Sequence, residues 1–96
     1  MTSTMQQPVE LLRDRLEHAF AIHTNRLNEL TLRGSMTDPT TFEARVEAAR
    51  RGIANTAQAL RRMSEGTYGR CEACGTTIAW QRLEAVPHAR HCSDCR

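Results

Sequence analysis

The chain has 96 residues, of which 40% are hydrophobic and 25% charged, and its 13 basic and 11 acidic residues leave a net charge of +2. This length allows one small domain, whose core is marginal without a metal or covalent staple. The even charge balance gives no indication of direct DNA binding, and no apolar run reaches the ~20 residues of a membrane span. Because the N-terminus also lacks a secretion signal, we expect a cytoplasmic protein that does not bind a membrane.

Residues 9–33 carry the pattern of an amphipathic helix. Apolar or semi-apolar residues recur there at steps of three or four positions: Val9, Leu12, Leu16, Phe20, His23, Leu27 and Leu30. This spacing places them on one stripe of an α-helix. Pro8 suits the first turn of that helix, so residues 1–8 are predicted to be a polar tail.

Residues 34–41 are predicted to form the turn that follows. Asp38 with Pro39 reads as an N-cap and a first helical residue. Thr40 with Glu43 offers a capping box instead, so the first residue of the second helix stays open. From its spacing alone, Asp38 is expected to act only as a helix cap.

Residues 42–65 are predicted to form the second helix. Its stripe consists of Phe42, Val46, Ala49, Ile53, Ala57, Leu60 and Ser64. Gly52 interrupts the helix at a cost of about 1 kcal/mol relative to Ala. A solvated face is the expected place of four basic residues, Arg50, Arg51, Arg61 and Arg62. Two narrow stripes with charged flanks predict a mainly α fold, an antiparallel coiled-coil hairpin.

The C-terminal segment contains two Cys-x-x-Cys pairs separated by 17 residues, formed by Cys71, Cys74, Cys92 and Cys95. Each pair can present two thiolates to one ion, and the spacer lets the chain return to complete a tetrahedron. Four thiolates leave no open position for a substrate, so we predict one structural Zn²⁺ in a small zinc finger over residues 66–96.

Other chemistry finds little support in the sequence. His91 adjoins a proposed ligand, and His88 and His91 are expected to lie outside the ligand set. A thiol-based redox site is the weaker reading of the Cys pairs, because no thioredoxin-like context accompanies them. No catalytic triad or phosphate-binding loop can be assembled, so we do not expect an enzyme.

The zinc-finger segment contains an ordered set of residues, Gly66 to Gly75 (GTYGRCEACG), Ile78, Arg82 to Ala85, Pro87, and Cys92 to Arg96. In order and spacing this set resembles the signature of the DksA/TraR family of bacterial RNA polymerase-binding transcription regulators. The resemblance implies a zinc module at the base of a helical hairpin that binds the RNA polymerase core. The hairpin tip would enter the secondary channel to modulate initiation, with Asp38, Pro39 and Thr41 near the polymerase active site.

The sequence departs from the family pattern at two places. The family tip resembles Asp-Pro-x-Asp-x-Ala, whereas this chain keeps Asp38 and Pro39 but has Thr41 at the second acidic position. Family members also continue into a helix after the last Cys, so contacts of that helix are not expected beyond Arg96. No residue pattern assigns a guanosine tetraphosphate site. The alternative function is a zinc-finger module that binds another protein or nucleic acid outside the polymerase channel.

Overall fold

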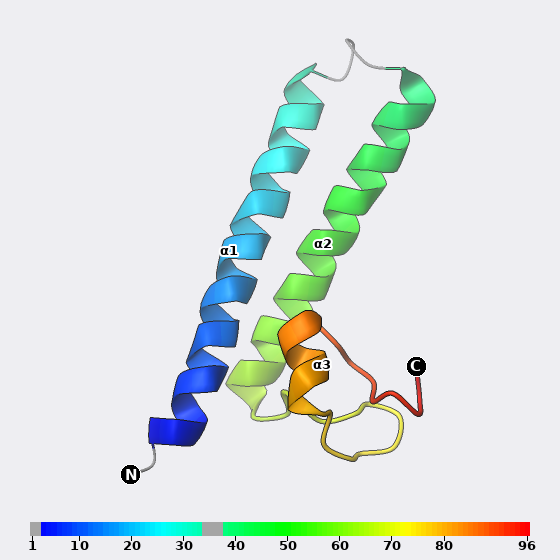
Figure 1. The fold of residues 1–96 in the computed structure, drawn as a ribbon. Coiled ribbons are helices and arrows are strands. Elements are labelled where there is room, and N and C mark those ends of the chain that lie inside the picture. Colours follow the sequence, from blue (N-terminus) through cyan, green and yellow to red (C-terminus); the bar gives the residue numbers. More distant parts are fainter. Residues whose placement is uncertain (1–2, 34–37) are drawn as a thin grey trace.

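The computed structural model describes residues 3–33 and 38–96, which form a helical hairpin with a small module at its base. Helix α1 spans Ser3–Arg33, α2 spans Pro39–Glu65 and the short α3 spans Trp80–Ala85. The two long helices run antiparallel, and residues 66–96 fold back against the end of the hairpin that holds the start of α1 (Figure 1). The predicted mainly α fold, a hairpin followed by a four-Cys module, is confirmed.

Helix α1 begins earlier than the sequence pattern predicted. It includes Ser3 to Pro8, although residues 1–8 were predicted to be a polar tail ahead of a helix starting at Val9. The hydrophobic stripe begins at Val9, so this periodicity gives no signal for the helix before that position. Its predicted end at Arg33 agrees with the structure.

The hairpin is packed more tightly near the module than near its tip. We call residues 9–23 and 49–65 the base half, and residues 24–33 and 38–48 the tip half. All fully buried hairpin residues described by the structure belong to the base half: Leu12, Leu16, Ala49, Thr56, Ala59 and Arg62. In the tip half, the inward-facing side chains remain half-buried, namely Leu27, Leu30, Phe42 and Val46.

The two predicted stripes need three corrections. Phe20 is 36% exposed, and Ala57 and Ser64 lie on the exposed side of α2. One row of buried or half-buried α2 residues instead follows steps of four and three: Phe42, Val46, Ala49, Ile53, Thr56, Leu60 and Met63. Ala59 and Arg62 are also buried beside this row. The predicted stripe included Ala57 in place of the buried Thr56, because its polar hydroxyl does not count as an apolar position in a hydrophobic pattern. That hydroxyl donates to the Gly52 carbonyl oxygen at 2.7 Å within the helix, which satisfies it without a partner outside α2.

Gly52 lies where the two long helices pass close to each other. The imidazole of His23 packs against it, and a Cβ at this position would lie 2.5 Å from three ring atoms. The absence of a side chain therefore gives His23 its place in the interface. The buried Nδ1 of His23 has no hydrogen-bond partner among the described residues.

The module forms a second core with α1. Its buried members are Leu12, Cys71, Ile78, Leu83 and Ala89. Helix α3, which the sequence analysis did not predict, brings Leu83 into this core. Its six residues are too few to show a helical periodicity in the sequence.

Among the helices within residues 3–33 and 38–96, none combines the length and apolar character that crossing a membrane requires.

Candidate metal centre

The first Cys pair lies on a tight turn stabilised by the backbone. The Gly75 amide donates to the Cys71 carbonyl at 2.9 Å, and the Cys71 amide donates to the Thr76 carbonyl at 2.7 Å. Gly75 has φ of +78°, a left-handed conformation that glycine adopts without strain. The turn therefore holds Cys71 and Cys74 on the same side of the backbone, as a metal-binding knuckle requires.

The second Cys pair forms a similar but shorter turn near the C-terminus. The Cys95 amide donates to the Cys92 carbonyl at 3.1 Å. The two turns are joined by a hydrogen bond from the Glu72 amide to the Arg90 carbonyl at 2.9 Å. This contact brings together segments far apart in the chain and directs both Cys pairs toward one point.

All four Cys sulfur atoms lie within 4.8 Å of one another. The Cys74 and Cys92 sulfurs are 3.7 Å apart. Zinc–sulfur bonds of about 2.3 Å in a tetrahedron require sulfur–sulfur distances of about 3.8 Å, so the observed separation suits one zinc ion. The prediction that the two Cys pairs meet at one site is confirmed, and the described ion-binding cluster contains neither His88 nor His91.

Three of the thiols, those of Cys71, Cys92 and Cys95, have shifted pKa values. A hydrogen bond from the Cys92 backbone lowers the pKa of Cys71 to about 6, and one from the Asp94 backbone lowers the pKa of Cys92. Hydrogen bonds with the Cys74, Cys92 and Cys71 side chains raise the pKa of Cys95 to about 12. The Cys95 thiol therefore holds its proton through hydrogen bonds with the neighbouring sulfurs, and a divalent cation at the centre of the cluster would favour loss of that proton.

Arg62 ties the module to α2 and is the residue that the sequence analysis placed wrongly. It was predicted on a solvated face, yet it is 8% exposed, and its guanidinium lies 3.4 Å from the carbonyl oxygens of both His88 and Ala89. It also lies 3.6 Å from the Glu72 carboxylate, which in turn pairs with Arg90 at 3.1 Å. Burial lowers the pKa of Arg62, and the Glu72 charge opposes this effect.

Three further hydrogen bonds fix the outer segments of the module. The Tyr68 hydroxyl donates to the Pro87 carbonyl at 2.8 Å, and Arg82 Nε donates to the His91 carbonyl at 2.8 Å. Arg15 of α1 donates to the Glu84 carbonyl at 2.9 Å. Arg82 thus supports the segment that leads into Cys92.

The predicted tip residues lie at the opposite end of the molecule from the Cys cluster. Asp38 is exposed and is the N-cap of α2, where its carboxylate accepts a hydrogen bond from the Thr41 amide at 3.2 Å. Pro39 is the first helical residue, so the Asp38 cap is realised and the Thr40 alternative is not. Residues 34–37 of the predicted turn lie outside the described residues.

The module is similar to a known protein family. Residues 66–96 match the family described as the prokaryotic dksA/traR C4-type zinc finger. This range contains all four clustered Cys residues. The match and the geometry agree on one structural zinc ion.

Two curated proteins are similar to larger parts of the chain. General stress protein 16O of Bacillus subtilis (strain 168) is 35% identical over 89 residues, which are 93% of this chain and 49% of that protein. The RNA polymerase-binding transcription factor DksA of Escherichia coli (strain K12) is 38% identical over 47 residues, 49% of this chain and 31% of that protein. The chain therefore spans at most about half the length of these relatives.

A solved structure has the same fold. Transcription factor DksA2 from Pseudomonas aeruginosa superposes with a TM-score of 0.66 and 21% identity, over 97% of this chain and 80% of that one. The likeness concerns the arrangement of a helical hairpin and a C-terminal module.

Proposed function

We propose, because residues 66–96 belong to the prokaryotic dksA/traR C4-type zinc-finger family, that this chain is a bacterial transcription regulator that binds RNA polymerase. The similarity to the RNA polymerase-binding factor DksA supports this proposal over 47 residues. The protein would act in the cytoplasm, where its partner is. Its zinc ion, held by Cys71, Cys74, Cys92 and Cys95, would be structural.

The finer proposal is that the hairpin reaches through the secondary channel and acts with its tip. One observation carries it: an exposed carboxylate, Asp38, sits at the end of the hairpin farthest from the zinc module (Figure 1). Helix α2 has 27 residues and, at 1.5 Å per residue, spans roughly 40 Å between the two ends. A carboxylate delivered over that distance can interact with catalytic magnesium ions or compete with acidic ligands for them.

The contacts of Asp38 support this proposed role beside its capping role. Its side chain caps α2 through the Thr41 amide and remains exposed to a partner. The cap holds the carboxylate against the start of α2, so the helix positions its charge. Pro39 and Thr41 complete the proposed tip.

The first experiment tests polymerase binding and the place of the tip. A photo-crosslinking amino acid at Thr41 should react with polymerase residues around the active centre when the protein is mixed with purified bacterial core enzyme. The same group at exposed Ser93 should react with the outer surface instead. Absence of a complex with the core enzyme would favour the alternative of a module that acts outside the channel, as would recovery of duplex DNA or another protein when the same variants are crosslinked in a bacterial lysate.

The second experiment tests the charge at the tip. Asp38→Asn keeps a good N-cap and removes the charge, so it should bind polymerase like the parent and lose most of its effect on transcription in vitro. Thr41→Asp, which adds a second acid near the helix N-terminus, should strengthen the effect. If Asp38→Asn regulates as well as the parent, obstruction of the channel replaces the acidic-tip mechanism.

A further inference from the structure

Helix α1 carries a second row of residues, separate from the face that packs on α2. All seven side chains of this row are exposed, and they follow alternating steps of four and three positions: Leu11, Arg15, His18, Ile22, Asn25, Glu29 and Leu32. Such steps keep residues along one side of an α-helix, with a slight drift that a left-handed supercoil absorbs. We call these seven residues the outer row.

Most of the large apolar side chains exposed in the described parts of the chain belong to the outer row. Leu11 is 64% exposed, Ile22 is 42% exposed and Leu32 is 84% exposed. A further exposed residue, Trp80 of α3, lies beside Leu11, and the two help to line a pocket of about 480 Å³. Large apolar side chains gathered on one exposed face are typical of an interaction surface.

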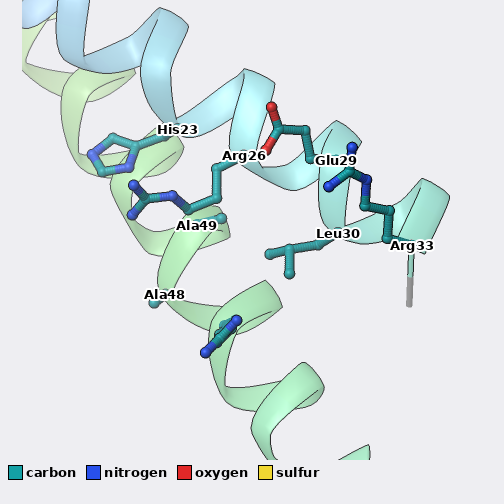
Figure 2. A pocket seen from close by; sticks show the side chains of 8 residues that line it. His23, Arg26, Glu29, Leu30, Arg33, Ala48 and Ala49 are labelled. Atoms are coloured by element: carbon teal, nitrogen blue, oxygen red, sulfur yellow. The ribbon is translucent and has the colours of Figure 1, made fainter. Parts of the chain in front are cut away.

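The charges of the outer row lie symmetrically about Ile22. Arg15 precedes Ile22 by as many positions as Glu29 follows it, and within residues 3–33 and 38–96 neither forms an ion pair. Figure 2 shows Glu29 between Arg26 and Arg33 along the tip end of α1. These two Arg residues make that end of the row net positive, whereas acidic residues outnumber basic ones in residues 10–17 at the other end.

We propose that α1 pairs with α1 of a second copy of this chain, side by side and antiparallel, about a two-fold axis near Ile22. The two Ile22 side chains then meet at the axis, and Arg15 of each copy lies opposite Glu29 of the other. Because the axis relates the two copies, this charge pair forms twice. A parallel pair would instead set Arg15 against Arg15 and Glu29 against Glu29, so repulsion between like charges disfavours it. The proposal does not depend on polymerase binding.

The same arrangement fills the pocket beside Trp80. It places Leu32 of one copy next to Leu11 and Trp80 of the other, at both ends of the contact. From Leu11 to Leu32 the contact is roughly 32 Å long at 1.5 Å per residue. Two single helices bury less surface than a standard interface of about 1,600 Å², so we expect a reversible dimer with a Kd of roughly 10–100 μM.

Sedimentation equilibrium of the zinc-loaded full chain, over a concentration series that spans the expected Kd, measures the dimer. Ile22→Asp puts two carboxylates at the axis and should raise the Kd about tenfold or more. The matched control is Ala57→Asp, which adds the same charge to an exposed position of α2 and should dimerise like the parent. Because Trp80 is the only tryptophan in the chain, its fluorescence should change on dimerisation, and Leu32→Ser should abolish that change.

An exchange of the paired charges tests the antiparallel arrangement. Arg15→Glu alone and Glu29→Arg alone each set like charges opposite each other and should raise the Kd, whereas the double variant restores opposite charges and should dimerise nearly like the parent. The double variant still lacks the hydrogen bond from Arg15 to the Glu84 carbonyl, so that contact cannot account for the recovery. A chain that stays monomeric over the whole series, a double variant no better than either single variant, or Trp80 emission that does not change on dimerisation would overturn the proposal.

Discussion

The base half and the tip half of the hairpin are built from the same two helices but are held together differently. In the base half, the zinc module covers the hairpin as a third layer, and Leu12, Leu16 and Ala59 are at most 2% exposed. In the tip half, two helices face each other alone, and Leu27 and Leu30 remain half-buried. Two helices leave most of their circumference open to water, so the module adds burial where it packs on the hairpin, as at Leu12. Ala49 is buried without belonging to that core.

This difference indicates a division of labour between the two halves. Stability is concentrated where three layers meet, and the tip half is extended from that support by helix continuity, the Asp38 cap and modest interhelical packing. Substitutions in the two halves should therefore differ in cost, and this contrast can be tested directly.

The largest effect is expected from loss of the zinc ion. Cys74→Ser removes one sulfur at an exposed position, so little packing is lost with it. Because structural zinc contributes about 10 kcal/mol or more in small zinc fingers, the module should unfold and free Leu12 and Arg62 from their partners. Native mass spectrometry should show metal-free protein, and the melting temperature should fall steeply.

The matched control for loss of the metal is Ser93→Ala. Ser93 lies between the ligands Cys92 and Cys95 and carries no sulfur. This variant should keep both the zinc and the melting temperature. A Cys74→Ser protein that melts like the parent while metal-free would show that the base half does not depend on zinc.

A pair of Leu truncations compares the two halves most directly. Leu16→Ala should lower the free energy of unfolding by about 3 kcal/mol, since it empties a fully buried position in the base half. Leu30→Ala in the tip half should cost about 1 kcal/mol, because that side chain is already partly hydrated. Urea unfolding followed by circular dichroism measures both values, and equal costs would contradict the division between the halves.

Arg62 tests the polar link between α2 and the module. Arg62→Ala leaves the His88 and Ala89 carbonyls without this donor and deprives Glu72 of one of its two cationic partners, at an expected cost of about 2 kcal/mol. The neighbouring Arg61 pairs only with Glu65 in an exposed contact, so Arg61→Ala should cost about 0.5 kcal/mol or less. Similar costs for both variants would show that the buried guanidinium adds nothing beyond a surface contact.

The smallest effect is expected at the junction of the two halves, where His23 packs on Gly52. Gly52→Ala gains about 1 kcal/mol of helix propensity, but its Cβ meets the imidazole at 2.5 Å, and we expect a net loss of about 1 kcal/mol. His23→Ala combined with Gly52→Ala should recover stability relative to Gly52→Ala alone. If the double-mutant cycle shows no coupling energy between His23 and Gly52, a steric clash between the new Cβ and the imidazole does not explain the loss.

The sequence was sufficient to predict the elements whose signals are local. The helix ends at Arg33 and Glu65, the Asp38 cap and the meeting of the four Cys residues follow from neighbouring residues or from fixed spacing. The burial of Arg62 was not predictable in this way. Its carbonyl partners lie 26 and 27 residues further along the chain, and nothing around position 62 distinguishes it from exposed Arg61.

The hydrophobic pattern also failed to predict polar side chains that are buried inside the hairpin. A hydrophobic pattern counts Thr56 as an interruption, although its hydroxyl is satisfied by its own helix. The start of α1 at Ser3 and the short α3 were missed because neither shows a repeated apolar face.

The contact between Leu12 and the zinc module has a consequence for synthesis of the chain. The other members of this core lie between Cys71 and Ala89, and Arg15 meets the Glu84 carbonyl across a separation of 69 residues. At about 5–20 residues per second, a ribosome needs several seconds to make the segment between them. During that interval the first helix leaves the ribosome with its Leu face uncovered, and the domain is completed only when the last Cys pair has emerged and captured its metal.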